Sequence, residues 1–192
     1  MNTINHVEST KRDFSFIDLG LSVKWATCNV GATSPEEYGN YYSWGEVVPK
    51  SEYTKENYAL YVPKDQSYTD IGSNISGSSF DAAHVEWGER WRMPTANEMT
   101  ELCKNCTIER ASLNGIVGAK VIGPNGNSIF LPMTGSRYER ELRFRSRFGC
   151  YWTGSLDEHD FRRANGLFCD REKWVQDQFY RFEGLSIRPV TD

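Results

Sequence analysis

The hydrophobic and polar positions of this chain change their spacing several times, and each change predicts a structural element. Between Thr95 and Cys106 the apolar side chains follow the spacing of one helical face. They stand at Met99, Leu102, Cys103 and Cys106. Thr95 with Glu98 three residues later is a capping-box pattern. We therefore predict a helix that begins after Thr95 and turns this face to the core, and a shorter helical turn over 81–87.

Elsewhere the pattern is that of short strands. Residues 118–123 and 128–133 are apolar runs on either side of Pro124-Asn125-Gly126-Asn127, and Asn-Gly between such runs is a strong hairpin signal. The other predicted strands lie in 14–31 (one or two strands), 37–46, 149–155, 164–170 and 185–190. Residues 47–80 show little periodicity but contain many tyrosines, so we expect a long ordered excursion. Many short strands and few helices predict an α+β domain.

Length and composition favour one folded unit. The chain has 192 residues, of which 14% are aromatic, and rings of this size favour burial in a core. We expect a single domain over 14–192, preceded by a loose polar arm over 1–13. The predicted core contains Trp25, Trp44, Trp91, Leu102, Phe130, Leu131, Trp152 and Ile187.

Charge and hydropathy disfavour several classes of partner. The net charge is −4, so binding to nucleic acid would need a local basic patch and is disfavoured. No apolar run approaches the roughly 18 residues of a membrane helix, so we expect no membrane insertion. The opening residues 1–14 contain no hydrophobic segment and are not a secretory signal peptide. Export by another route, release with a larger particle and loss of a leader all stay open.

The cysteines do not predict a metal site or a disulfide framework. There are five, so they cannot all pair within one chain. Cys103 and Cys106 have the spacing of half a zinc site, but no second pair of ligands follows, and the three histidines are scattered. We expect free, mostly buried thiols and no cofactor or metal. No sequence motif of a nucleophile with its base is present, and enzyme activity has no positive support.

Two segments carry the residues of a candidate binding surface. In 137–148, Arg143, Arg145 and Arg147 alternate with other residues, so in a strand their guanidinium groups would share one face. This segment is interpreted as an exposed recognition edge, with a plain solvated edge as the alternative. In 157–183, charges of both signs mix with aromatic rings, a composition enriched in protein–protein hot spots. The alternative there is that the apolar residues belong to the core.

We predict that these two segments supply the ligand-binding side chains. The predicted ligand-binding residues are Arg143, Phe144, Arg145, Arg147, Phe148, Asp157, His159, Asp160, Phe161, Arg162, Arg163, Asp170, Arg171, Trp174, Asp177, Phe179, Tyr180 and Phe182. No catalytic residue is predicted.

Several motifs together resemble a known fold family. Residues 91–95 (WRMPT) with Glu98 resemble the W-R-[LM]-P-T-x-x-E signature of the formylglycine-generating-enzyme type of C-type-lectin fold. Residues 14–31, 44–46, 125–132, 151–152 and 186–190 are similar to the Fibrobacter succinogenes major paralogous domain family. The resemblance implies one C-type-lectin-like domain whose last strand pairs near the first. The segment before that strand would form the exposed ligand face.

The resemblance does not extend to the family's chemistry. Formylglycine-generating enzymes use two closely spaced cysteines near the C-terminus, whereas Cys150 and Cys169 are nineteen residues apart. The sugar-and-calcium triplets of true C-type lectins are also missing. Some members of the fold are variable proteins of diversity-generating retroelements, in which adenine substitution yields Phe, Arg, Asp, His, Tyr, Ser or Cys. Much of the candidate surface consists of these types. Either the residues that do not fit are fixed by the template or the retroelement hypothesis is wrong; they are Glu158, Glu172, Lys173, Trp174, Gln176, Gln178 and Glu183.

We therefore expect a non-enzymatic recognition domain, such as the tip of a phage tail or a surface adhesin, located on a virion or a cell surface. The expected partner is a protein or glycan on a cell surface, and the sequence leaves a homo-oligomer open. The alternative is a thiol- or metal-dependent oxidase related to formylglycine-generating enzymes, using Cys150 or Cys169 with copper or calcium.

Overall fold

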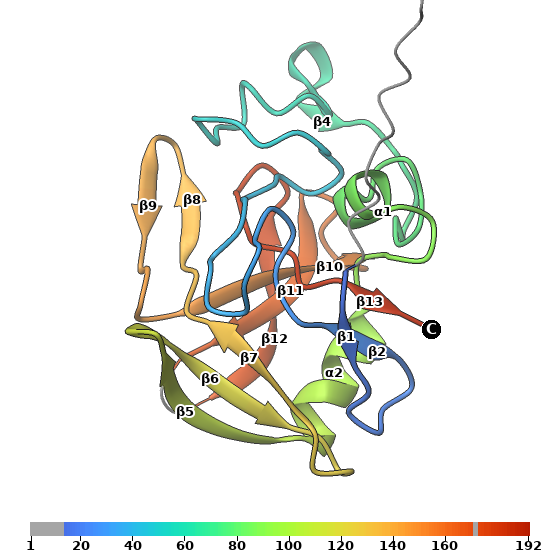
Figure 1. Ribbon diagram of the computed structural model, residues 1–192. Coiled ribbons are helices and arrows are strands. Elements are labelled where there is room, and N and C mark those ends of the chain that lie inside the picture. The colour runs from blue at the N-terminus through green and yellow to red at the C-terminus, as the bar shows by residue number, and fades with distance from the viewer. Residues whose placement is uncertain (1–13, 171–172) are drawn as a thin grey trace, which may run out of the picture.

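A computed structural model describes residues 14–170 and 173–192 (Figure 1). The predicted arm over 1–13 and the predicted site residue Arg171 lie outside the described residues. Three small sheets and two hairpins, all with antiparallel pairing, accompany two α-helices and a short 3₁₀ helix. This composition confirms the predicted α+β class.

The elements group by their pairing partners. The three-stranded sheets are β1 (Phe16–Ile17), β2 (Lys24–Ala26) and β13 (Val190–Thr191); β5 (Thr107–Leu113), β6 (Ile116–Ile122) and β7 (Ser128–Pro132); and β10 (Gly149–Leu156), β11 (Arg163–Cys169) and β12 (Trp174–Tyr180). The hairpins are β3 (Tyr61–Val62) with β4 (Ser67–Tyr68), and β8 (Ser136–Tyr138) with β9 (Glu141–Arg143). The helices are α1 (Ala82–Trp87), α2 (Ala96–Asn105) and the 3₁₀ helix η1 (Pro63–Asp65).

Both predicted α-helices form, and each begins directly after its capping residue. The Thr95 hydroxyl accepts from the Glu98 N–H, and the Glu98 carboxylate accepts from the Thr95 N–H, which completes the predicted capping box of α2. Asp81 caps α1 in the same way through the N–H groups of Ala83 and His84. None of the helices in the described residues is long and apolar enough to cross a membrane.

The predicted hairpin of residues 118–133 is confirmed, because β6 and β7 pair antiparallel across the Asn-Gly turn. Two other predicted strands are wrong. Residues 37–46 contain only an isolated bridge from Tyr42 to Leu185, since Gly39 and Gly45 both adopt positive φ and interrupt extended backbone. The strand predicted over 185–190 is reduced to β13, which pairs with β2.

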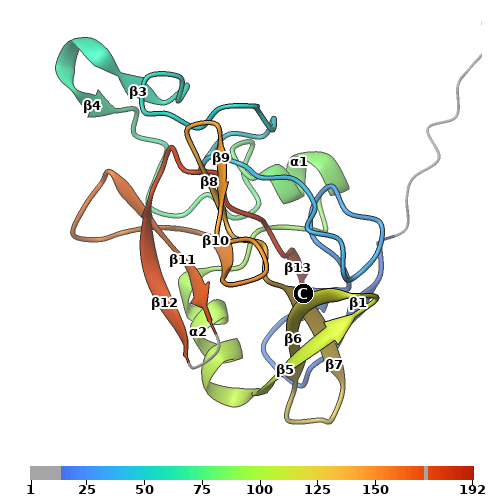
Figure 2. The ribbon, with the colours of Figure 1, turned by 90° about the vertical axis from the view of Figure 1, so that its left-hand side faces the viewer.

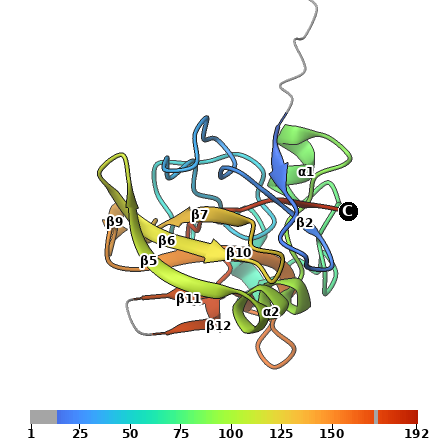
Figure 3. The ribbon, with the colours of Figure 1, turned by 60° about the horizontal axis from the view of Figure 1, so that its bottom comes forward.

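Two buried clusters lie on opposite sides of the β10–β11–β12 sheet. Tyr151 and Leu167 belong to the cluster that packs against α2 and the β5–β6–β7 sheet. Trp152 and Ala164 belong to the other cluster, with Trp44. All eight residues predicted for the core are buried. The sheet is therefore the middle layer of the molecule, and Figure 3 shows α2 lying beside it.

The long excursion over 47–80 is ordered, as predicted, because its tyrosines reach the core. Tyr58 is buried and donates to the carbonyl oxygen of Trp44 at 2.6 Å. The buried guanidinium of Arg181 donates to the Tyr58 hydroxyl and to the carbonyl oxygens of Thr69 and Phe161. Arg181 therefore ties the excursion to the loop that precedes β11.

Candidate ligand-binding face

The register of the β10–β11–β12 sheet assigns its side chains to two faces. Directly opposed residues of antiparallel strands share a face. Phe168 opposes both Cys150 and Val175, and Gly166 opposes both Trp152 and Asp177. The other face contains Leu167 and Gln176, and the Gln176 side chain accepts from the Thr100 hydroxyl of α2 at 2.7 Å. The face with Phe168 and Asp177 is free of α2, but the buried cluster that contains Trp44 and Trp152 covers its β10 part. We call the remaining open part the free face.

Aromatic rings fill part of this free face. Phe148 contacts Phe168 with ring centroids 5.1 Å apart, and Phe179 meets Trp152 edge to face at 5.8 Å. Val175 and Asp177 of β12 are exposed on this face. Val175 lies opposite Phe168 of β11, and Asp177 lies two residues before Phe179 on β12. The free face therefore has half-buried rings as its base and open positions on its outer strand.

A continuous series of ring and cation contacts crosses from the loop before β11 to the β8–β9 hairpin. Arg163 lies 3.7 Å from the Asp160 carboxylate and 4.3 Å from the Tyr180 ring centroid. Tyr180 stacks on Phe182 at 5.4 Å, and Phe182 contacts Tyr138 at 5.7 Å. The guanidinium of Arg143 lies 4.1 Å from the Tyr138 ring centroid.

A second series of contacts begins at the next residue, Phe144, and lies on the face with Phe168. Phe144 contacts Phe148 at 5.0 Å, Phe148 contacts Phe168, and Lys173 lies 5.4 Å from the Phe168 ring centroid. We call the whole set the arginine–aromatic belt; its members are Asp160, Arg163, Tyr180, Phe182, Tyr138, Arg143, Phe144, Phe148, Phe168 and Lys173. Figure 2 shows β8 and β9 on the same side of the molecule as β11 and β12.

The strand predicted through Arg143, Arg145 and Arg147 is wrong beyond Arg143. Strand β9 ends at Arg143, and Phe144 and Ser146 then adopt φ values of 61° and 64°. Their backbone is left-handed there, so the chain turns and the three guanidinium groups do not share one strand face. Arg145 instead lies over the Tyr38 ring at 4.7 Å.

A glycine makes the close return of this turn possible. Gly135 has a φ of 67°, and a Cβ at this position would lie 2.1 Å from the carbonyl oxygen of Arg143. No side chain fits there, so Gly135 fixes the distance between the start of β8 and the end of β9. The turn that carries Phe144 and Arg145 is held against β10 by this contact and by the hydrogen bond from the Gly135 N–H to the Phe148 carbonyl.

The loop before β11 presents a second group of exposed residues. Arg162 donates twice to the Asp160 carboxylate, at 2.8 and 2.9 Å, and these bonds lower the pKa of Asp160. Phe161 is 54% exposed, and its ring edge contacts Tyr68 of the excursion at 6.0 Å. The loop is thus braced from both sides while Phe161 and Arg162 face solvent.

The prediction that Phe182 is a ligand-binding residue is not matched by its exposure, because its side chain supplies almost no accessible contact area. Its ring is only 7% exposed because Tyr138 and Tyr180 cover it. The neighbouring Arg181, whose residue type also fits adenine substitution, is 2% exposed and belongs to the framework. Phe179 and Tyr180 are half-buried, so their contact area is smaller than the sequence implied.

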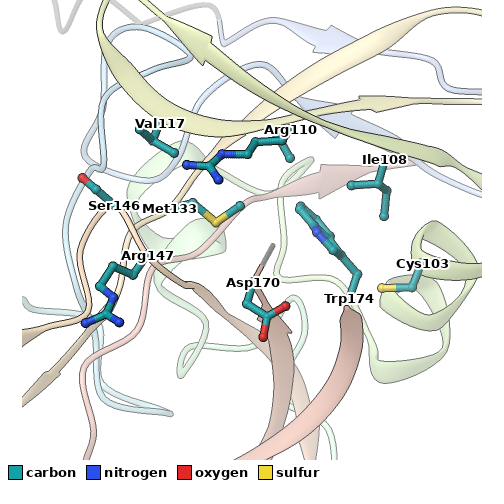
Figure 4. Close-up of a pocket in the computed structure, with 10 residues that line it drawn as sticks. Cys103, Ile108, Arg110, Val117, Met133, Ser146, Arg147, Asp170 and Trp174 are labelled. Atoms are coloured by element: carbon teal, nitrogen blue, oxygen red, sulfur yellow. The ribbon is translucent and has the colours of Figure 1, made fainter. Parts of the chain in front are cut away.

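The remaining predicted residues line two other recesses. Asp157 and His159 lie at a polar cleft of about 580 Å³ beside the N-terminus of α2, and the Asp157 carboxylate accepts from the His159 N–H. Arg147, Asp170 and Trp174 line a separate cavity of about 290 Å³ (Figure 4). The structure therefore divides the predicted site into a belt, a cleft and a cavity.

Glu183 is a carboxylate of this region that the sequence did not single out. Its pKa is raised by burial, while the nearby charges of Arg163 and Arg143 act in the opposite direction. The Tyr180 N–H donates to its carboxylate at 3.3 Å. Glu183 therefore lies behind the belt and neutralises part of its positive charge.

Some side chains of the belt and of the residues beside it are connected by no local sequence pattern. Tyr138 lies in the 137–148 segment, and its place opposite Glu141 follows only from the β8–β9 register. Tyr38 and Tyr68 reach Arg145 and Phe161 from more than 90 residues away in the sequence. Their only sequence signal was the general excess of tyrosine.

The cysteines of the alternative enzyme hypothesis face opposite sides of the sheet. Cys150 shares the face of Phe168, whereas Cys169 belongs to the cluster on the α2 side. Burial raises the pKa of Cys150 to about 12 and that of Cys169 well above its ordinary value. All five cysteines are free, and no cluster of three or more His, Cys, Asp or Glu suited to a metal occurs in 14–170 and 173–192.

The belt combines three kinds of side chain. It offers forked cationic donors, exposed rings and one paired carboxylate, held by a rigid aromatic base. No protein-family model, curated protein or solved structure significantly matches this chain.

Proposed function

We propose that this chain is a non-enzymatic recognition domain that binds a cell-surface protein or glycan through the arginine–aromatic belt and the adjoining loop of residues 157–163. The observation that carries the proposal is the belt itself: the loop before β11, the β8–β9 hairpin with the turn after it, and the strands β11 and β12 bring cations and rings into contact. Such side chains bind strongly because they present large, preorganised contact areas and directed donors.

The division between fixed and exposed positions supports this proposal. Phe144 and Phe161 are each about half exposed, at 49% and 54%. Each stands beside residues that are anchored by ion pairs or ring contacts. A ligand would therefore meet exposed rings at little cost in ordering the surface.

The proposal includes the fold that the sequence motifs resemble. In a C-type-lectin-like domain of the formylglycine-generating-enzyme type, the terminal strand pairs near the first strand and the preceding segment is displayed. Here β13 pairs with β2, and the belt residues precede it in sequence. The resemblance and this pairing together support the assignment.

We also propose that retroelement diversification acts on the exposed turn and loop, in a phage tail-tip or adhesin protein. The support is that Phe144, Arg145, Phe161 and Arg162 are exposed and are residue types that adenine substitution yields. Arg181 is of the same kind but is buried, so we expect it to be constant. A reverse transcriptase gene beside this one, with a near-copy of the 3′ coding stretch differing at adenines, would be the corresponding genomic observation.

The oxidase alternative has less support. The two candidate thiols lie on opposite faces of one sheet, and burial keeps both protonated at neutral pH.

The test is binding of the full chain to fractionated host cell envelope, with two variants. Phe144→Ala with Phe161→Ala removes the two exposed rings, and we expect at least a tenfold loss of capture with little change in melting temperature. Phe16→Ala is the matched control, because Phe16 is a similarly exposed phenylalanine on β1, at 40%. Protease and periodate treatment of the envelope distinguish protein from glycan.

The proposal is overturned if the wild-type chain captures nothing, or if the double variant and Phe16→Ala retain capture equally. A large fall in melting temperature for the double variant would show instead that these rings belong to the core.

A further inference from the structure

The cavity of about 290 Å³ lies apart from the free face of the sheet, at the end of the β11–β12 hairpin. Its lining residues come from α2, β5, β6, the ends of β7 and β11, the turn after β9 and the start of β12. They are Cys103, Ile108, Arg110, Val117, Ala119, Met133, Ser146, Arg147, Asp170 and Trp174 (Figure 4). Ala119 and Met133 are almost fully buried and give the cavity an apolar base.

The cavity lining has hydrogen-bond donors without acceptors. The guanidinium groups of Arg110 and Arg147 make no ion pair, hydrogen bond or ring contact with any residue in 14–170 and 173–192. By contrast, Arg143, Arg162 and Arg163 each have a carboxylate within 4 Å. As far as residues 14–170 and 173–192 are concerned, Arg110 and Arg147 therefore have their donors available for an anion.

The aromatic wall of the cavity adds another donor. Trp174 is half-buried, and its indole N–H has no hydrogen-bond partner among the described residues. Two potential competitors are already engaged. The Asp170 carboxylate accepts from the Lys173 N–H at 2.8 Å, and the Ser146 hydroxyl lies 3.2 Å from the Tyr38 hydroxyl.

We propose that this cavity binds a carboxylate that carries an aromatic or branched apolar body. The planar guanidinium group of Arg110 matches a carboxylate through two parallel hydrogen bonds, and Arg147 adds a second positive charge. The apolar body packs on Met133 and against the Trp174 ring. In Figure 4 Asp170 lies on the side of the cavity away from Arg110, so its charge opposes a ligand carboxylate less there.

The cavity volume limits the size of this ligand. At about 290 Å³ it lies at the lower end of the range of roughly 300–1,000 Å³ that drug-sized ligands occupy. One aromatic ring with a short acidic arm is of this size. Such a group is found in small aryl carboxylic acids and in a peptide that ends in phenylalanine, and the two sources share the recognised chemistry.

The test is a titration of the full chain with 3-phenylpropionate, and with its neutral amide as the matched ligand. Calorimetry gives the affinity. A change in tryptophan fluorescence on binding that is absent in Trp174→Phe shows that the ligand binds at this cavity. We expect the acid to bind at least tenfold more tightly than the amide. A peptide ending in phenylalanine, with a free or an amidated terminus, then distinguishes a protein terminus from a small acid.

Two arginine variants with the same charge change localise the site. We expect Arg110→Gln to weaken binding of the acid at least tenfold, because a charge-assisted bidentate pair is lost. Arg140→Gln is the control, since Arg140 is exposed on the β8–β9 turn, is 3.5 Å from Glu52 and does not line the cavity. We expect it to change the affinity less than twofold.

The inference is overturned if neither acid binds at millimolar concentration, if the amide binds as well as the acid, or if Arg110→Gln and Arg140→Gln have equal effects. Arg110 is exposed on β5, so loss of folding is not expected, and a thermal melt of each variant checks this. The result is independent of envelope capture through Phe144 and Phe161, and either proposal can fail while the other holds.

Discussion

Arginines occupy two contrasting regions of this molecule, the framework and the arginine–aromatic belt. Arg188, in the framework, is 1% exposed and donates to the Asn29 side chain and to the carbonyl oxygens of Ala26, Thr27 and Phe130. Burial lowers its pKa from the ordinary value, and no ion pair to a carboxylate of the described residues compensates it.

Arg143 of the belt and Arg145, which lies beside the belt in the turn after β9, have the opposite environment. Arg143 and Arg145 lie over tyrosine rings at the surface, at 4.1 and 4.7 Å from the ring centroids. A guanidinium over an exposed ring keeps most of its donors free, whereas one surrounded by carbonyl oxygens has them occupied. The comparison shows that the same residue type serves stability in one region and is available for recognition in the other.

The largest expected effect is that of Arg188→Met. The methionine fills much of the space but leaves three buried oxygen acceptors and the part-buried Thr27 carbonyl oxygen without their donor, and each buried acceptor costs about 1–3 kcal/mol. We expect the free energy of unfolding, measured with urea, to fall by about 4 kcal/mol or more. Arg188→Lys keeps the positive charge but lacks the several N–H donors of the guanidinium group, so its free energy of unfolding should be higher than that of Arg188→Met but lower than that of wild type. A loss below about 1 kcal/mol for Arg188→Met would contradict the framework role.

An effect of intermediate size is expected at the Arg92–Glu98 ion pair, which joins α2 to the C-terminal residue Asp192. Burial alone would raise the pKa of Glu98, but hydrogen bonds from Arg92 and Thr95 lower it below its ordinary value. In the unfolded chain Glu titrates near 4.3, so there the unfolded state binds more protons than the folded state. The stabilisation is therefore present above about pH 4.3 and is lost as the pH falls through the folded pKa.

Glu98→Gln tests this by removing the titrating group. We expect it to cost about 1–2 kcal/mol at pH 7, and the difference from wild type to shrink as the pH falls below about 4.3, in urea unfolding at several pH values. The matched control is Glu141→Gln, which removes an exposed ion pair with Arg143 in the belt. We expect this variant to change stability by less than about 1 kcal/mol at any pH. If the stability difference from wild type depended on pH equally for Glu98→Gln and Glu141→Gln, the distinction between framework and belt would be contradicted.

The parts of the fold that the sequence predicted are those with local causes. The capping box at Thr95, the Asn-Gly turn before β7 and the tryptophans of the core act through neighbouring residues or through their own apolar area. The strand predicted over 185–190 does not form as one ladder, because its two ends pair with different distant segments. Leu185 bridges to Tyr42, and Val190 pairs with Trp25, so no continuous ladder forms.

The candidate site was predicted in composition but not in geometry. Phe144 and Phe161 are exposed as expected, but Phe182 is covered by rings on either side of it. The alternation of arginines after Arg143 resembled a strand, yet positive φ at Phe144 and Ser146 converts it into a turn. The exposure of these side chains and the geometry of the turn depend on contacts with residues distant in sequence. A local pattern of residue types does not contain that information.

The smallest effect on stability is expected for Arg145→Met, the same substitution as at Arg188 but in the turn after β9. Arg145 makes an exposed cation–π contact with Tyr38, which is worth about 0.5–1 kcal/mol, and its guanidinium also interacts with the Tyr41 hydroxyl. We expect urea unfolding to show a loss of about 1 kcal/mol or less, because the buried Tyr41 hydroxyl still donates to the Thr134 carbonyl oxygen without this guanidinium. Capture of the cell-envelope ligand should fall severalfold, since an exposed donor of the proposed binding surface is removed. If Arg145→Met instead destabilised the protein as much as Arg188→Met, its guanidinium would be structural, and the belt would be part of the framework.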